Sequence, residues 1–537
     1  MDTDILVVGA GPTGLMLANQ LARRGVRPLV IDRHSGPAMQ TRAIGVQART
    51  LEIYAKLGIV DRALELGKRG EGANLWARGH LTAHIPIGDI GKGESPFPYI
   101  FMLGQDDNER ILGDKLHDLG VDVRWNTELV ALQSRPDDVT ATLKQPDGSL
   151  RTVTCAWIAG CDGARSSVRE LNSIVFPGAP YEHVFFVADT IATGGMVEDE
   201  VNVYLWKEGF HLFFPMRGKD HWRVIGILPE PLRGKQDLTF EEVVPSIRGE
   251  AGSGLEFHEC SWFSTYRIHH RCASQFRAGR CFLLGDAAHV HSPVGAQGMN
   301  TGLQDAYNLA WKLALVVGDE ADTSLLDSYE AERLPVAQRL LRTTDRAFML
   351  VVKDTWIAAL FRTQILARIA AFAMRRQRVR KLAFRTISQI GIRYRRSTLS
   401  RTLTGLPDDA PRAGDRFPWL ELKLRDDGPL EDLFETIDDT RFNLLVFGQP
   451  ATATPELAHA FRTHEISSDA VNGAPLARAH ISTPSFYLLR PDGHIGLAGT
   501  RLDMTATLAY LSDCGLRVGK LGSAASSTKA SALAFRA

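Results

Sequence analysis

The sequence predicts an α/β protein in which a β-rich middle part separates two stretches of mixed helix and strand. Three observations carry this prediction. An apolar strand, a glycine-rich loop and an amphipathic helix open the chain within residues 5–25. Residues 176–271 are rich in Val, Phe, Tyr and Trp, which favour strands. Strand-like runs return at 442–447 and 485–489. We therefore expect a Rossmann-like opening domain, a β-sheet domain and a smaller C-terminal α/β unit.

Composition limits the classes of protein that fit. The chain has 537 residues, 44% hydrophobic and 23% charged, which is typical of a globular protein. Its 62 basic residues balance 62 acidic ones, so we expect neither nucleic-acid nor membrane binding. No apolar run reaches the about 18 residues of a membrane span, and no signal peptide is evident. The six cysteines include no C-x-x-C pair, so neither a zinc site nor a dithiol redox motif is expected. Six cysteines in so long a chain do not make a disulfide framework, so we expect a reducing compartment, the cytoplasm.

The N-terminal third reads as alternating strands and helices. Ile5–Val8 is a buried strand, and Val26–Ile31 is a second one that ends at Asp32. One helical stretch is expected from Thr41 to Gly58 and another helix from Asp106 or Asp107 to Gly120, each with its glycine at the C-terminal end. Two alternating runs, 139–144 and 150–159, flank a Pro-Asp-Gly turn and predict a hairpin.

The rest of the chain is expected to hold a long helix, a helical region and the last α/β unit. Gly298–Val317 has helical spacing of apolar residues, and residues 320–400 look helical throughout. A basic run at 375–401 is interpreted as a solvated helix face. Residues 404–414 resemble a linker, 490–493 a hairpin turn, and the tail from Gly519 is expected to be disordered.

The first motif with chemical meaning is Gly9-x-Gly11-x-x-Gly14. The first glycine permits a tight turn, the second lets a pyrophosphate approach the backbone, and the third lets the helix pack on the sheet. The start of the following helix presents free N–H groups and the positive end of its dipole to phosphates. Asp32, after the next strand, suits a ribose hydroxyl. This context predicts a dinucleotide site, although it does not distinguish NAD from FAD.

Two further clusters indicate which dinucleotide is bound. Gly160-Cys161-Asp162-Gly163-Ala164-Arg165-Ser166 and Gly285-Asp286-Ala287-Ala288-His289 each follow a strand, and Pro293–Asn300 follows the second cluster. With the glycine loop, this ordered set resembles the class A flavoprotein aromatic hydroxylases, the single-component FAD monooxygenases of the phenol hydroxylase and polyketide hydroxylase branch. The resemblance runs from Ile5 to about Leu516.

The resemblance implies a domain plan and a cofactor site. It implies an FAD-binding domain at 1–175 and 276–403, interrupted by a substrate-binding sheet at 176–275, and a thioredoxin-like domain at 404–518. The only cysteine of that last unit, Cys514, excludes dithiol redox chemistry there. The residues implied to hold FAD are Gly9, Gly11, Thr13, Gly14, Asp32, Arg33, Arg42, Gln105, Asp162, Gly163, Gly285, Asp286, Pro293, Gly298, Met299 and Asn300.

The implied reaction uses NADPH or NADH and O2 to hydroxylate a phenolic or polycyclic aromatic compound through a C4a-hydroperoxyflavin. Phenol hydroxylases carry an Ala-Asp-Gly triplet where this chain has Ala43-Ile44-Gly45, so deprotonation of a simple phenol by that aspartate is not expected. Relatives with a third domain are often dimers, so the resemblance allows a homodimer.

The substrate side is less specific. Tyr266 and then His211 are the candidates for deprotonating a phenol, because both lie in the aromatic middle sheet. Their alternative interpretation is a structural place in that sheet. His289 and His291 lack further ligands nearby, so no metal site is predicted. A flavin halogenase, a flavin dehydrogenase and a non-catalytic binder of aromatic compounds are the competing functions.

Overall fold

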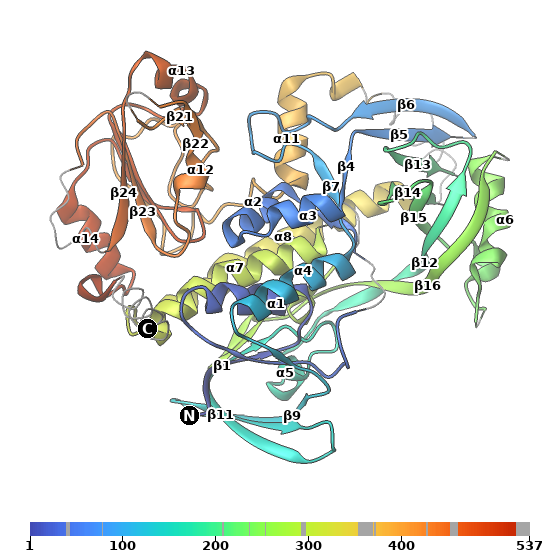
Figure 1. The fold of residues 1–537 in the computed structure, drawn as a ribbon, viewed down its shortest axis with the longest axis horizontal. Coiled ribbons are helices and arrows are strands. Elements are labelled where there is room, and N and C mark those ends of the chain that lie inside the picture. The colour runs from blue at the N-terminus through green and yellow to red at the C-terminus, as the bar shows by residue number, and fades with distance from the viewer. Residues whose placement is uncertain are drawn as a thin grey trace.

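The computed structural model describes residues 1–38, 43–77, 79–206, 209–235, 237–252, 254–291, 297–352, 369, 372–425, 428–451 and 460–521. Figure 1 shows two large sheets, one toward the bottom and one toward the right, and a separate C-terminal unit at the left. Helices occupy the centre between these three bodies. The tail from Gly519 onward, which is expected to be disordered, lies outside the described residues except for its first three.

The first sheet forms the N-terminal α/β layer. Strands β18, β11, β1 and β2 are neighbours in that order and run parallel. Helix α1 (Pro12–Ala22) contacts both α4 (Gln105–Asp118) and α7 (Gly298–Val317). The strands are β1 (Thr3–Val8), β2 (Leu29–Ile31), β8 (Val123–Arg124), β9 (Glu128–Ser134), β10 (Val139–Lys144), β11 (Leu150–Gly160), β17 (Arg277–Ala278) and β18 (Cys281–Leu283). The predicted hairpin is the antiparallel pair β10–β11.

The second sheet contains the β-rich stretch expected at residues 176–271, and it also includes three strands from outside that stretch, β5, β6 and β19. Its order is β19-β16-β12-β15-β14-β13-β5-β6, and only the pair β13–β5 is parallel. Helix α6 (Phe240–Ala251) packs on one face through an apolar cluster that includes Phe186 and Phe213. The strands are β5 (Gly72–Ala77), β6 (His80–Pro86), β12 (Gly178–Thr193), β13 (Val201–Leu205), β14 (Phe210–Pro215), β15 (His221–Ile227), β16 (Glu256–Cys272) and β19 (His289–Val290).

The C-terminal unit has a five-stranded sheet in the order β20-β26-β25-β23-β24. Its elements are β20 (Arg401–Thr402), β21 (Glu421–Lys423), β22 (Leu430–Asp432), α12 (Leu433–Thr436), β23 (Phe442–Phe447), β24 (Phe461–Ile466), α13 (Ala470–Arg478), β25 (Ser485–Leu489), β26 (Ile495–Gly499) and α14 (Met504–Asp513). The predicted turn at 490–493 joins the antiparallel strands β25 and β26. Its likeness to thioredoxin stays a prediction.

The remaining elements connect these bodies. Helix α2 ends before Gly58, which has a left-handed φ of 73°. Helix α7 has the bounds that the sequence predicts, Gly298–Val317. These elements are β3 (Gly45–Val46), α2 (Ala48–Leu57), α3 (Val60–Leu66), β4 (Lys68–Gly70), β7 (Ile100–Met102), α4 (Gln105–Asp118), α5 (Ser167–Leu171), α7 (Gly298–Val317), α8 (Asp327–Val352) and α11 (Gln377–Ile387), with 3-10 turns at Glu230–Leu232, Gly285–Ala287, Thr323–Leu326 and Val518–Lys520.

Two expectations about the connections are wrong. Residues 388–400 form turns rather than helix. Residues 404–414 are not a free linker, because Leu406, Ala410 and Ala413 are buried in the core of the C-terminal unit. Turn-forming residues occur in both segments, Gly and Ser in the first and Gly, Pro and Asp in the second, and the apolar residues of the second segment make tertiary contacts that the local pattern does not indicate.

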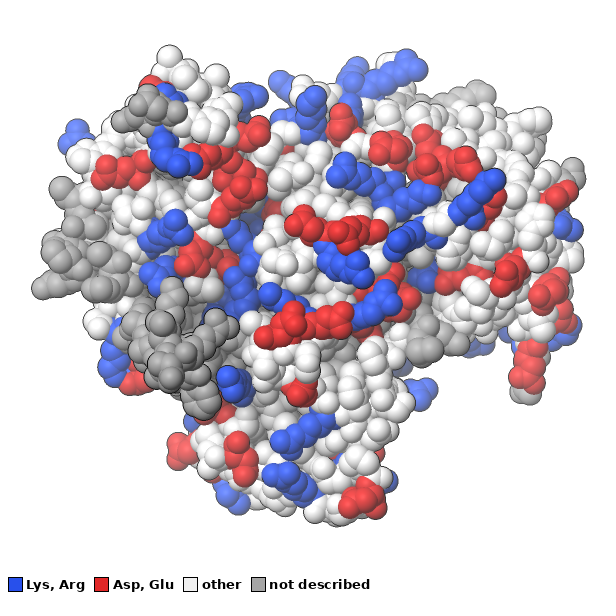
Figure 2. All heavy atoms as spheres, viewed as in Figure 1, with Lys and Arg blue, Asp and Glu red and all other residues white. Residues whose placement is uncertain are grey.

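Charge is distributed without a dominant sign. Figure 2 shows acidic and basic side chains interspersed over the visible face. Members of the basic run at 375–401 face acids far away in sequence: Lys381 and Arg385 pair with Glu94, and Arg395 pairs with Asp415 at 2.7 Å. Among the described residues, no helix has the length and apolar character needed to cross a membrane.

Candidate active site

The carboxyl ends of four parallel strands meet at one edge of the first sheet. Val8 of β1 lies opposite Ile31 of β2 and Gly160 of β11, and Gly160 lies opposite Leu283 of β18. The glycine loop, Asp32, the Asp162–Gly163 turn and the Gly285–Asp286 turn begin directly after these strands. Ligands of open α/β sheets bind at this edge, so the motifs singled out in the sequence converge where a dinucleotide would bind.

The glycine loop has the steric character expected of a phosphate cradle. Gly9 has a φ of +102°, and a Cβ there would overlap the carbonyl of Cys161. A Cβ at Gly14 would overlap the carbonyl of Gly9, whereas a Cβ at Gly11 would meet nothing within 4 Å. Helix α1 (Pro12–Ala22) starts after Gly11 without a side-chain cap. The loop is therefore tightly held at both ends, and its middle leaves room for a ligand against the helix start.

Asp32 links the glycine loop to the end of β2. Its Oδ2 accepts a hydrogen bond from the backbone N–H of Ala10 at 2.7 Å, and its Oδ1 accepts one from the N–H of His34 at 2.8 Å. Arg33 is exposed beside it. The carboxylate thus lies beside the loop, where a ribose hydroxyl can reach it.

The Asp162–Gly163 turn packs directly against the glycine loop. Oδ2 of Asp162 accepts a hydrogen bond from the N–H of Val168 at 3.2 Å. Oδ1 is buried and has no hydrogen-bond partner among the described residues. Burial raises the pKa of Asp162. A buried oxygen without a partner at this edge fits a bound molecule that supplies a donor.

The Gly285–Asp286 turn is held from behind by helix α7. Gly285 has a φ of +56°, and a Cβ there would lie 2.7 Å from Oγ1 of Thr13. Its backbone N–H donates to Oδ2 of Asp305 at 3.0 Å. Asp286 is exposed while Gly285 and Ala287 are buried. The turn therefore presents one carboxylate outward from a fixed backbone.

The start of helix α7 is fixed by Asn300. Its Oδ1 accepts hydrogen bonds from the N–H of Gln47 at 2.8 Å and from Oγ1 of Thr50 at 2.7 Å, and its Nδ2 donates to the carbonyl of Gly45 at 2.9 Å. Sδ of Met299 accepts from Nδ2 of Asn108 at 3.4 Å. Among the described residues, no side chain caps this helix. The backbone N–H groups of Gly298, Met299 and Asn300 lie in the first turn of this helix, where they can stabilise negative charge on a ligand.

Gln105 starts helix α4 and is oriented by Glu109. Its Nε2 donates to Oε1 of Glu109 at 2.8 Å, and Oε2 of Glu109 accepts from the N–H of Ala38 at 2.9 Å. Burial raises the pKa of Glu109. Arg42 and Pro293, the other two residues expected at the cofactor, lie outside the described residues.

One face of the second sheet points toward this site. Arg223 on β15 donates to the carbonyl of Ala43 at 3.3 Å, so its face is the inner one. The guanidinium forms a two-pronged ion pair with Asp189 on β12, at 2.7 and 2.6 Å, and lies 5.8 Å from the ring centre of Trp262. Tyr266 lies opposite Phe185 on the same face, with ring centroids 6.0 Å apart. The sequence pattern singled out Tyr266 but missed Arg223.

His211 points the other way. Alternation along β14 places it on the face covered by α6, beside the rings of Trp206 and Phe186 at 5.7 and 5.8 Å. It is fully buried, and neither ring nitrogen has a hydrogen-bond partner among the described residues. Burial lowers the pKa of His211 to about 3. We therefore drop the expectation that His211 deprotonates a substrate, because the sheet separates it from the inner face.

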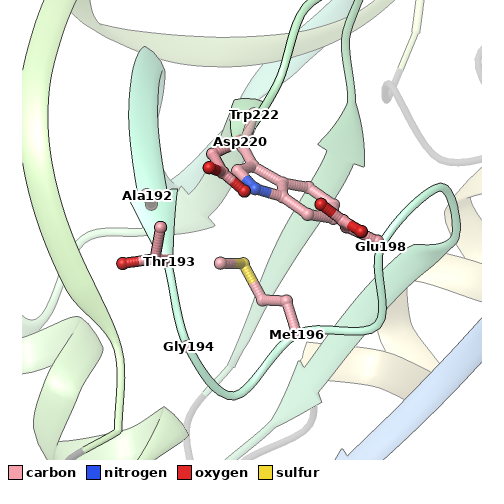
Figure 3. A pocket seen from close by; sticks show the side chains of 7 residues that line it. All are labelled: Ala192, Thr193, Gly194, Met196, Glu198, Asp220 and Trp222. Atoms are coloured by element: carbon pink, nitrogen blue, oxygen red, sulfur yellow. The ribbon is translucent and has the colours of Figure 1, made fainter.

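A surface pocket of about 330 Å³ lies at the far end of the second sheet. Figure 3 shows Met196, Trp222 and the carboxylates of Glu198 and Asp220 around it. It belongs to the end of β12 and the start of β15, whereas the opposite end of β16 pairs with β19 beside the Gly285–Asp286 turn. The pocket is therefore not part of the sheet edge that carries the glycine loop and the Asp162–Gly163 and Gly285–Asp286 turns. Among the described residues, no group of three His, Cys, Asp or Glu side chains is arranged to hold a metal.

Comparison with known proteins identifies the class of protein that this fold and site define. Residues 2–344 match the model of the FAD-binding domain family, FAD_binding_3. The chain belongs to this family, and it is an FAD-dependent monooxygenase of the aromatic hydroxylase class.

Individual relatives cover nearly the whole chain. The chain is 33% identical to 6-methylpretetramide 4-monooxygenase of Streptomyces rimosus over 94% of this chain and 92% of the relative. An anhydrotetracycline hydroxylase structure from Streptomyces rimosus aligns with a TM-score of 0.75 and 29% identity, over 96% of this chain and 99% of that one. A ternary complex of aklavinone-11 hydroxylase with FAD and aklavinone aligns with a TM-score of 0.78 and 25% identity, with the same coverage.

Proposed function

We propose that the protein hydroxylates a polycyclic phenolic compound of the kind made by aromatic polyketide synthesis. The observation that carries this proposal is the 33% identity over 94% of the chain to a relative named 6-methylpretetramide 4-monooxygenase. The aromatic inner face of the second sheet supports it, because an apolar wall with few polar groups suits a large planar ligand. NADPH or NADH is the proposed electron donor. A homodimer and a cytoplasmic location remain predictions; the six cysteines, all free, fit the latter.

The residues at the carboxyl edge of the first sheet, where the glycine loop and the two glycine–aspartate turns lie, fit FAD. We assign the pyrophosphate to the open backbone at Gly11 and the start of α1, and the adenosine ribose to Asp32. Asp286 and the unpartnered oxygen of Asp162 would accept hydrogen bonds from cofactor hydroxyls. The first N–H groups of α7 would face the electron-accepting ring and favour its negative charge.

When bound, FAD supplies the redox chemistry: it takes a hydride from NAD(P)H and activates O2 for transfer of one oxygen atom to the aromatic ring. The chain's own residues orient the substrate and control its proton. Tyr266, on the inner face, would hydrogen-bond the phenolic oxygen of the substrate and, in its ionised form, would take up the phenolic proton. The Arg223–Asp189 pair offers charged donors and acceptors to ring oxygens on the same face. The sheet itself excludes water from that side.

The proposal is tested with purified FAD-loaded protein, NADPH or NADH, and a panel of simple and tetracyclic phenols. We expect a tetracyclic phenol to accelerate NAD(P)H oxidation and to gain one atom from isotopically labelled O2, measured by mass spectrometry. If no ligand accelerates the oxidation and no oxygenated product forms, the proposal fails. A product that requires chloride would indicate a halogenase. Oxidation without oxygen insertion would indicate a dehydrogenase, and ligand binding without FAD uptake a non-catalytic binder.

The cofactor assignment makes a prediction at Asp286. Asp286→Ala should weaken FAD binding by at least about tenfold, because a cofactor hydroxyl pair would lose its charged acceptor. The exposed position of Asp286 means that the apoprotein should keep its melting temperature. FAD titration by fluorescence measures the first quantity and thermal unfolding the second. Full FAD occupancy in the variant at micromolar concentration would remove Asp286 from the site.

A further inference from the structure

A hairpin of the C-terminal unit reaches into the buried interior of the FAD-binding part. The hairpin turn at 490–493 carries Arg490 and Asp492, which are 1% and 2% exposed. Arg490 donates to both oxygens of Glu332 on α8, at 2.6 and 3.0 Å, and it also bonds Asp492. A two-pronged guanidinium–carboxylate pair of this kind fixes orientation as well as distance. The turn is therefore rigidly joined to α8.

Glu332 extends the contact from the hairpin to helix α7. Its Oε2 accepts hydrogen bonds from Nζ of Lys312 at 2.9 Å and from Nδ2 of Asn308 at 2.7 Å, and its Oε1 accepts one from Oγ of Ser397 at 2.6 Å. Burial lowers the pKa of Lys312 to about 8, while Arg490 and Lys312 lower the pKa of Glu332 against the cost of its burial. Every charge here thus depends on its neighbours for compensation.

Arg333, the next residue of α8, extends these contacts to the structures assigned to the cofactor. Nε of Arg333 donates to Oδ1 of Asp305 at 2.6 Å, and its Nη2 donates to the carbonyl of Thr301, in the first turns of α7, at 3.1 Å. Asp305 in turn accepts the N–H of Gly285 and binds Nε2 of His289 at 2.8 Å. Arg333 therefore contacts the start of α7 directly and the Gly285–Asp286 turn through Asp305, and both structures are assigned to the cofactor.

A second line of contacts leads from the same turn to the start of α7. The carbonyl of Asp492 accepts a hydrogen bond from Nη2 of Arg49 at 2.6 Å, and Arg49 lies in the first turn of α2. Gln47, which precedes that helix, donates its N–H to Asn300. The hairpin thus reaches the α7 terminus through two sets of buried contacts, one through Glu332 and Arg333 and the other through Arg49.

From this arrangement we propose that Arg490 and Asp492 are positioning residues of the flavin site, so that the C-terminal unit sets the geometry in which FAD is held. The inference rests on the proposed placement of FAD at the Gly285–Asp286 turn and the start of α7. Removing one partner of a buried charged set leaves the others uncompensated, so α7, α8 and the turn must shift to relieve it. The C-terminal unit would then act on the cofactor through helices α7 and α8.

The experiment compares Arg490→Met with Arg23→Met in the full chain. Arg23, at the end of α1, forms a two-pronged pair with buried Asp439 of the C-terminal unit, at 2.9 and 3.1 Å. It is a matched contact between the same two bodies that includes neither Glu332 nor Arg333; Asp439 also accepts a hydrogen bond from the hydroxyl of Tyr307, in the middle of α7, at 3.1 Å. We expect Arg490→Met to raise the FAD dissociation constant at least tenfold and to shift the midpoint potential of the bound flavin. Arg23→Met should lower the melting temperature and change neither flavin quantity.

Two further variants keep the test decisive. Arg490→Lys retains the positive charge but cannot form the two-pronged ion pair with Glu332, so it should restore part of the FAD affinity. If Arg490→Met does not fold, Arg490→Lys takes its place in the comparison. Asp305→Asn combined with the Arg490 variant should raise the dissociation constant by less than the product of the single effects, because both act through one set of contacts. Multiplicative effects, or an unchanged potential in both Arg490 variants, would overturn the inference. If the wild-type chain itself binds no FAD, the proposed function fails instead.

Discussion

At the scale of single residues, Tyr266 is the group whose chemistry is most directly testable. Tyr266→Phe keeps the ring packed against Phe185 and removes only the hydroxyl. We expect hydroxylation to slow by about 10²-fold, since that is the contribution of a positioned acid or base, while FAD remains bound. Tyr204→Phe is the matched control, because Tyr204 lies on the α6 face and donates to the carbonyl of Gly195 at 3.0 Å. Equal rates in the wild type and Tyr266→Phe would remove Tyr266 from the mechanism.

His211 affects stability rather than catalysis in this fold. Its pKa is about 3 in the folded state and 6.5 when unfolded, so between these values only the unfolded chain binds a proton there. Stability therefore falls as the pH drops from about 6.5 toward 3, at about 1.4 kcal/mol per pH unit. In His211→Phe, the loss between pH 7 and pH 5 should be smaller by about 2 kcal/mol.

Urea unfolding of the apoprotein at the two pH values measures this difference for His211. His464, whose pKa burial lowers to about 4, is present in both proteins and cancels in the comparison. An identical pH dependence in the two proteins would show that His211 is not buried in its neutral form.

At the scale of elements, two substitutions in the glycine loop distinguish a steric effect on folding from a loss of FAD binding. Gly14→Ala forces a Cβ into the carbonyl of Gly9, so the apoprotein should lose about 1–3 kcal/mol and FAD affinity should fall with it. Gly11→Ala meets no atom within 4 Å, so the apoprotein should unfold at an unchanged temperature while FAD binding falls at least about tenfold. Thermal unfolding and FAD titration of both variants provide the test. Normal FAD binding by Gly11→Ala would place the pyrophosphate elsewhere.

The elements also show what a sequence can reveal. The bounds of α7 were predictable because its apolar residues recur at helical spacing and glycines flank both ends. The face on which His211 lies was not, since strand alternation fixes two faces but does not indicate which one α6 covers. Glu332 and Arg333 look like an ordinary exposed pair on a polar helix, and their partners Arg490 and Asp305 are distant in sequence. Such buried charge sets leave no local signal.

At the scale of the whole molecule, the C-terminal unit and the FAD-binding part share a core. Trp311 of α7 is 1% exposed and meets Phe442 of β23 edge to face at 5.9 Å, in a cluster that also holds Leu325 and Leu488. Apolar side chains from both bodies therefore bury one another, in addition to the charged contacts at Glu332. This makes the C-terminal unit part of one cooperative structure rather than an appended module.

A chain ending at residue 403 should consequently fail to fold stably. It would expose Trp311 and leave the buried Glu332 without Arg490, and breaking a buried ion pair alone costs about 3–5 kcal/mol against a total stability of about 5–15 kcal/mol. We expect little soluble protein and no cooperative thermal transition. Co-expression of residues 404–537 as a separate chain should restore both, because the interface is built from side chains that two chains can supply equally well. A truncated chain that melts near the wild-type temperature would show that the two bodies are energetically independent.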